Sequence, residues 1–294
     1  MVVDSNFLQR DELRDYLSAA PDNHAVLTDY AAIEAYKGET LKSIFRSMEI
    51  LTAFPKQVII LKGTQVICGM SGRAEAVQES LVDKTQTRDF SAYCRDLLAA
   101  KNGDLSFQQG ILEHGREASA HMDRVLQDMP LLSSGFALMA QEYTLAELKN
   151  LRERGELSSE LRTKLVQNVV GLATQLSANF PSSMVRSRSA RMRDAFLFRY
   201  ALCTHILIVK ASGGTPKTNR EKLRNDMVDV NFATFATYFD GLMTADKKAA
   251  EIFADADFLL RDVFALPPWP VRAFIPLARG FRLLLDSLRR KNKI

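Results

Sequence analysis

Residues 225–247 read NDMVDVNFATFATYFDGLMTADK, and this stretch decides the fold that the sequence predicts. Asp226 and Asp229 are spaced i,i+3, so a helix points both carboxylates to the same side. Small and apolar residues follow them, as in a helix that packs on a sheet. Residues 239–244 then predict a short buried strand, and Asp246 comes just after it. Because ligands of open α/β sheets bind at the carboxyl ends of the strands, we expect a site there.

Two more buried strands are predicted near the N-terminus. Residues 24–29 (HAVLTD) and 57–61 (QVIIL) are continuous apolar runs, which is typical of strands covered on both faces. Helical segments separate the two runs, and the order strand, helix, strand favours a parallel sheet. Residues 1–22 are polar with a short helical pattern, which predicts an N-terminal helix.

The middle of the chain has a helical pattern almost without interruption. Thr144 and Glu147 have the spacing of a capping box, which predicts the start of one of these helices. We therefore expect an α/β fold in which the sheet is made by the two ends of the chain, with a long helical insertion between them. The expected parts are an N-terminal part of the α/β domain (1–67), a helical insertion (68–190), a C-terminal part of the same domain (191–265) and a basic tail helix (266–294).

The composition is that of an ordinary globular protein, with 47% hydrophobic and 25% charged residues. The sequence shows no signal sequence and no apolar run that could span a bilayer, so we expect a cytoplasmic protein without a membrane partner. The cysteines Cys68, Cys94 and Cys203 lie far apart in apolar surroundings and lack CxxC spacing. We expect them to be buried thiols in a reducing compartment.

Charge is distributed unevenly along the chain. Residues 186–224 hold ten Lys and Arg against two acids, residues 225–262 hold three against eight, and residues 263–294 hold seven against one. An acidic pocket flanked by basic segments suits a polyanion whose phosphates approach a metal ion. The alternative is that the basic segments are solvated faces. The candidate phosphate-contacting residues are Arg186, Arg188, Arg191, Lys217, Arg220 and Arg224.

Carboxylates gather at the predicted edge of the sheet. Asp29 ends the strand at 24–29 and Asp246 follows the last strand, so both meet at one edge if these strands are neighbours. Asp226 and Asp229 come from the helix before the last strand, and Glu34 comes from the helix after Asp29. A cluster of carboxylates without His or Cys suits Mg²⁺ or Mn²⁺ rather than zinc. Such metals activate water and neutralise charge at a phosphodiester.

This arrangement resembles the PIN-like domain family, which contains metal-dependent ribonucleases and relatives of flap nucleases. The resemblance rests on AVLTD at 25–29, NDMVD at 225–229 and DGLMTAD at 240–246. It implies a three-layer α/β/α fold around a parallel sheet, and an endoribonuclease that uses Mg²⁺ or Mn²⁺ and prefers RNA to DNA. Three features depart from the family pattern. The candidate second acid, Glu34, comes only five residues after Asp29. Tyr30 and Ala31 follow Asp29 where the family has a small polar residue, and the helical insertion exceeds a minimal domain of the family.

The resemblance also assigns the acids of the family to particular residues. Thr244 matches the hydroxyl residue that precedes the last acid by two positions. Of the two acids on the late helix, Asp229 is favoured as a metal ligand because it lies deeper in the apolar part of the helix. The implied catalytic residues are Asp29, Glu34 (less directly Glu39 or Glu49), Asp226, Asp229 and Asp246, and the implied metal ligands are Asp29, Glu34, Asp229 and Asp246.

Two other functions stay open at this point. Arg116 and His121 fit the R-x4-H spacing of another, all-helical ribonuclease class that needs no metal, in which His is the acid/base and Arg clamps the phosphate. The third function is a non-enzymatic helical protein that binds RNA or another partner. Cleavage that stops on chelation favours the carboxylates, chelator-resistant cleavage favours Arg116 and His121, and no cleavage favours the binding protein. A homo-oligomer is compatible with all three.

Overall fold

The computed structural model describes residues 1–36, 40–70, 77–178, 192–212 and 219–265, without the side chains of 77, 123–134 and 220. These residues divide into two compact units. The sheet unit contains residues 1–67, 78–125 and 231–250, and the helical unit contains the other described residues. The predicted four-part division of the chain stays a prediction. The fold is mixed α/β and mostly helical, with a small parallel sheet and a large helical region.

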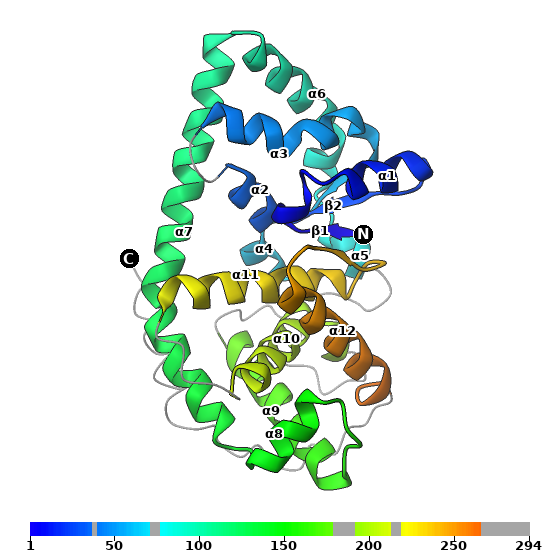
Figure 1. The fold of residues 1–294 in the computed structure, drawn as a ribbon, viewed down its shortest axis with the longest axis vertical. Helices are drawn as coiled ribbons and strands as arrows, with labels where there is room; N and C mark the ends of the chain where they lie inside the picture. The colour runs from blue at the N-terminus through cyan, green and yellow to red at the C-terminus, as the bar shows by residue number, and fades with distance from the viewer. Residues whose placement is uncertain (37–39, 71–76, 179–191, 213–218, 266–294) are drawn as a thin grey trace. The chain divides into compact units, whose positions relative to one another are not determined.

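The sheet unit is built on four parallel strands in the order β3-β2-β1-β4. Two of them, β1 and β2, are labelled in Figure 1. Val2 pairs with Val26 on one side and with Leu242 on the other, and Val26 also pairs with Ile59. The parallel sheet that the sequence predicts is therefore confirmed. The strands are β1 (Val2–Val3), β2 (Ala25–Leu27), β3 (Val58–Ile60) and β4 (Leu242–Met243).

The central strand β1 corrects the predicted topology. The predicted site depends on β2 and β4 being neighbours in the sheet, but β1 lies between them. The Asp4 backbone N–H donates to Met243 O at 2.9 Å, and the Val26 N–H donates to Met1 O at 2.9 Å. A two-residue strand is too short to show periodicity, so the sequence pattern alone does not reveal it. The predicted N-terminal helix is present as α1 (Asp11–Ala19).

Helices on this unit follow the apolar pattern of the sequence. Thr40 caps α3 (Leu41–Ala53) by accepting a hydrogen bond from the Ser43 N–H, as an N-cap residue does. Ile44, Met48 and Leu51 recur at helical spacing on α3 and are buried in one core with the strands. The other elements of the unit are η1 (Ser5–Phe7), α2 (Asp29–Tyr36), η2 (Pro55–Gln57), α4 (Thr64–Cys68), α5 (Val77–Leu81) and α6 (Lys84–Lys101).

The helical unit contains no strand in its described residues. Thr144 and Glu147 form the predicted capping box of α8 (Leu145–Arg152), because each side chain accepts from the other's backbone N–H. Helix α9 (Ser159–Ser177) packs against α10 (Phe196–Ala211). Phe198 and Phe264 meet edge to face, with their ring centroids 5.1 Å apart. The remaining elements are η5 (Met192–Asp194) and the long helices α7 (Leu105–Ala140), α11 (Arg220–Ala236) and α12 (Lys247–Asp262), which the division between the units crosses.

The structure shows where the three cysteines lie. Cys68 and Cys203 are buried as predicted, whereas Cys94 is only half-buried, and none of the three is in a disulfide. The apolar sequence around Cys94 predicts burial. In the structure Cys94 lies on α6 beside Tyr93 and packs against the edge of the core rather than inside it. None of the helices in the described parts of the chain combines the length and hydropathy of a membrane span.

Candidate functional site

Asp4 follows β1 directly and lies at the carboxyl end of this central strand. Its side chain accepts hydrogen bonds from Thr244 Oγ1 at 2.5 Å, Asn6 Nδ2 at 2.7 Å and Ser5 Oγ at 3.2 Å. All three donors are neutral, and Asp4 is only 3% exposed. Burial raises the pKa of the Asp4 carboxyl above its ordinary value. A buried carboxyl with a raised pKa at the end of a central strand marks a candidate functional group.

Two hydroxyl groups connect Asp4 with acids predicted from the sequence. Ser5 Oγ lies at hydrogen-bond distance from both Asp4 and Glu34 of α2, and its single proton is donated to one of them at a time. Thr244 donates to Asp4 and accepts from the Asp246 backbone N–H at 2.9 Å. The structure therefore brings Glu34 and Asp246 to the neighbourhood of Asp4. Sequence reasoning missed Asp4, although the pattern Val2–Val3–Asp4 is a short version of the apolar run with a final Asp that identified Asp29.

Asp246 and Asp29 both cap helices. Asp246 Oδ1 accepts from the N–H groups of Lys248 and Ala249 at 2.7 and 3.0 Å, at the start of α12. Asp29 accepts from Thr64 twice, from its N–H at 2.6 Å and from its Oγ1 at 2.7 Å, at the start of α4. Both carboxylates satisfy N–H groups that the first turn of a helix leaves without partners.

Asn231 adds an unsatisfied acceptor to the sheet unit. Its Nδ2 donates to Thr64 Oγ1 at 3.1 Å, which links it to Asp29. Asn231 is 2% exposed, and its Oδ1 atom has no hydrogen-bond partner among the described residues. A buried acceptor without a partner costs about 1–3 kcal/mol. A bound water or a ligand with a donor or positive charge at this atom would remove that cost.

The two predicted acids of α11 are buried. Asp226 is 1% exposed and Asp229 is 9% exposed. Both belong to the helical unit, whereas Asp29, Glu34 and Asp246 belong to the sheet unit. Among the residues that the structure describes, no three His, Cys, Asp or Glu side chains are grouped to hold a metal ion. At the carboxyl edge of the sheet, hydroxyl groups lie between the acids instead.

Most of the predicted phosphate-contacting residues lie outside the residues that the structure describes. Arg186, Arg188, Arg191 and Lys217 lie outside the described residues. Arg220 is the first residue of α11, and its side chain is not among those described. Arg224 is half-buried and donates to Asn225 Oδ1 from Nε at 3.2 Å and from Nη2 at 3.0 Å.

Arg116 and His121 point in different directions from α7. Five residues on an α-helix correspond to about 140° of rotation between the two side chains. Arg116 is exposed and pairs with Glu113 one turn earlier, and His121 packs edge to face on Tyr30 with ring centroids 6.0 Å apart. A single phosphate is therefore not clamped between them within one copy of this helix.

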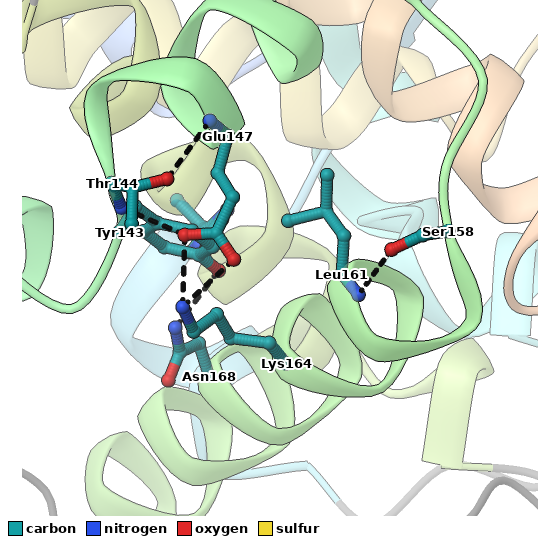
Figure 2. Close-up of polar contacts among 8 residues, drawn as sticks. Tyr143, Thr144, Glu147, Ser158, Leu161, Lys164 and Asn168 are labelled. Atoms are coloured by element: carbon teal, nitrogen blue, oxygen red, sulfur yellow. Dashed lines mark hydrogen bonds and ion pairs between the residues drawn. The ribbon is translucent and has the colours of Figure 1, made fainter.

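A second polar cluster lies inside the helical unit. Asn168 Nδ2 donates to the Tyr143 hydroxyl at 2.8 Å, and that hydroxyl lies 2.9 Å from His205 Nε2. Glu147 accepts from Lys164 Nζ, which lies over the Tyr143 ring (Figure 2). The Thr144 backbone N–H and then Lys164 hold the pKa of Glu147 below its ordinary value. Burial lowers the pKa of His205 to about 4, so this imidazole is neutral at pH 7.

Comparison with known proteins does not assign the chain to a family. No protein-family model matches the chain, and neither a curated protein nor a solved structure matches it. The function is therefore inferred from the residues at the edge of the sheet and from the short motifs of the resemblance.

The cap formed by Asp29 gives a prediction on stability. Replacing Asp29 with Ala is expected to lower the free energy of unfolding by about 1 kcal/mol, because the Thr64 N–H and hydroxyl lose their acceptor. Urea denaturation measures this change, with Asp22→Ala as the control because Asp22 is exposed. Equal stability of Asp29→Ala and the wild type would contradict the capping role.

Proposed function

We propose that this chain is a metal-dependent nuclease that hydrolyses phosphodiester bonds, with RNA rather than DNA as its substrate. The observation that carries the proposal is the buried Asp4 carboxyl at the end of the central strand, linked through Ser5 to Glu34 and through Thr244 to the backbone of Asp246. The preference for RNA follows from the resemblance to PIN-like nucleases, whose three-layer α/β/α fold we also propose for the sheet unit.

The residues at this edge fit a hard cation by their chemistry. Carboxylate, hydroxyl and amide oxygens are the ligands that Mg²⁺ and Mn²⁺ prefer. The unsatisfied Asn231 Oδ1 shows that the sheet unit holds a buried oxygen without a donor among the described residues. A bound Mg²⁺ or Mn²⁺ would activate water and neutralise charge on the phosphodiester. Because no three acids among the described residues are grouped to hold a metal ion, the Ser5 and Thr244 hydroxyls would share the coordination or turn away.

The proposal assigns roles to the residues of the chain. Asp4, Glu34 and Asp246 would hold the metal, and Asp4 takes the place that the sequence analysis gives to Asp29. Thr244 orients Asp4 through its hydroxyl and positions the loop before α12 through the Asp246 N–H. Asp226 and Asp229 stay candidate ligands from α11. Arg224 and the other basic residues named above would attract the polyanion and make binding depend on salt.

A cleavage assay with matched substrates tests this function. The purified chain is incubated with an end-labelled single-stranded RNA and with DNA of the same sequence, in Mg²⁺, Mn²⁺ or EDTA. We expect cleavage of the RNA with either metal and none in EDTA. Chelator-resistant cleavage that His121→Ala abolishes would replace the proposal with the R-x4-H mechanism. Binding of the RNA without cleavage under any condition would identify a non-enzymatic RNA-binding protein.

A further inference from the structure

The sheet unit contains a large open pocket beside the carboxyl ends of β2 and β3. Its volume is ≈ 890 Å³, which is within the size range of pockets for small organic ligands. Its lining comes from the strand ends, α2, α3, α6 and α7, all of them parts of the sheet unit. The pocket and the Asp4–Ser5–Glu34 group lie on different sides of α2: Ala32, Ile33 and Tyr36 line the pocket, whereas Glu34 of the same helix bonds to Ser5.

The inner wall of this pocket is apolar and aromatic. Met48 and Phe90 are buried, and both line the pocket and belong to the core of the sheet unit. The Tyr36 and Tyr93 hydroxyls hydrogen-bond to each other within the lining. The Phe90 and Tyr93 rings pack on each other with centroids 5.5 Å apart at 31°. Phe90 is 4% exposed, so the partly exposed Tyr36 and Tyr93 rings form the aromatic surface of the wall. Such a surface favours a flat ring as its ligand, because offset stacking of rings is favourable.

The rim of the pocket is acidic. Asp29, Asp89 and Glu117 line it, and none of the described lining residues is Lys or Arg. Asp89 pairs with Arg88 at 2.8 Å, but both side chains are more than half exposed, so this pairing is weak in water. His114 and His121 also line the rim, and His114 Nδ1 lies 3.4 Å from Glu117 Oε2. The lining therefore carries an excess of negative charge at neutral pH, which repels an anion and attracts a cation.

We propose that this pocket binds a small planar aromatic cation, such as a protonated arylmethylamine or arylamidine. The ring packs against Tyr36 and Tyr93, and the positive group lies at the rim near Asp29, Asp89 and Glu117. The aromatic face also stabilises an adjacent positive charge through its quadrupole. This site is separate from the nuclease edge proposed above, and its existence does not depend on that function.

Three naphthalene compounds that differ in charge test this site by isothermal titration calorimetry with the full chain. The compounds are 1-naphthylmethylamine (cation), 1-naphthylmethanol (neutral) and 1-naphthoate (anion). We expect the amine to bind most tightly and the acid most weakly, with about a tenfold or larger difference in Kd between them. No binding of any compound, or binding of the acid as tight as that of the amine, would overturn the proposal.

Variants of the lining locate the binding. Ala120 is exposed and lines the pocket. Ala120→Trp should therefore fill the mouth of the pocket and raise the Kd of the amine about tenfold or more. Gln109→Trp adds the same ring at an exposed position of α7 outside the pocket and should leave Kd unchanged. Glu117→Gln should raise the Kd of the amine about threefold and leave the Kd of the neutral alcohol unchanged. Equal effects of the two Trp variants, or an unchanged preference for the amine in Glu117→Gln, would show that the compounds bind elsewhere.

Discussion

Replacing Asp4 with Asn is expected to lower the rate of metal-dependent RNA cleavage by about a hundredfold or more. The amide keeps the shape of the side chain but removes the negative charge that would hold Mg²⁺ or Mn²⁺ at the sheet edge. Because a metal that binds the folded state stabilises it, addition of the metal should raise the melting temperature of the wild type. The melting temperature of Asp4→Asn should rise much less. The cleavage rate and the melting temperature are both measured over a metal titration.

The stability of Asp4→Asn without metal separates a functional charge from a structural one. Burial raises the pKa of Asp4 in the folded protein. The contribution of this carboxyl to the stability of the fold is therefore fully present below its ordinary pKa and is lost as the pH rises through the folded pKa. Burial therefore makes the charged form of Asp4 unfavourable for the fold, and the neutral amide, which keeps an acceptor oxygen for the contacts with Thr244 and Asn6, should leave the stability of the metal-free protein equal or slightly raised. Asp22→Asn is the control, since Asp22 is exposed.

Asp29→Asn distinguishes the two candidate positions for the first acid. If Asp4 holds the metal, Asp29→Asn retains cleavage and the metal-induced shift, while its stability falls because part of the Thr64 cap is lost. Wild-type cleavage by Asp4→Asn, together with an inactive Asp29→Asn, would return the site to the position that the sequence analysis predicts.

Lowering the pH from about 6.5 to about 4 is expected to reduce the free energy of unfolding by up to about 3 kcal/mol through His205. The pKa of this buried imidazole is lowered to about 4 in the folded protein from 6.5 in its ordinary state. The unfolded chain therefore binds a proton in this range of pH that the folded chain does not bind. The stabilising contribution is fully present above pH 6.5 and is lost as the pH falls towards the folded pKa.

Comparison of the wild type with His205→Gln isolates this effect from the titration of carboxyl groups. Gln is neutral throughout, and its amide can still accept from the Tyr143 hydroxyl that bonds to His205 Nε2. Urea denaturation at several pH values measures both proteins, and the wild type should lose up to about 3 kcal/mol more than His205→Gln as the pH falls from about 6.5 to about 4. His114→Gln serves as a control because the His114 side chain is 68% exposed. Parallel curves for the wild type and His205→Gln would contradict the prediction.

Several elements of the fold were determined by the sequence alone. The continuous apolar runs that contain β2 and β3 predict buried parallel strands, because strands covered on both faces exclude polar residues. Thr144 and Glu147 predict the start of α8, since a capping box depends only on residues three positions apart. The placement of Glu34 and Asp246 near the carboxyl edge of the sheet also follows from sequence order, because each comes shortly after a predicted strand.

Other features were decided only by the tertiary structure. β1 has two residues, and its position between β2 and β4 comes from hydrogen bonds to segments distant in sequence. This insertion places Asp4 at the end of the central strand. The cap that Asp29 provides depends in the same way on Thr64, which is 35 residues away. Periodicity and capping patterns record interactions between near neighbours in the chain, whereas burial and contacts between distant residues exist only after the elements have packed.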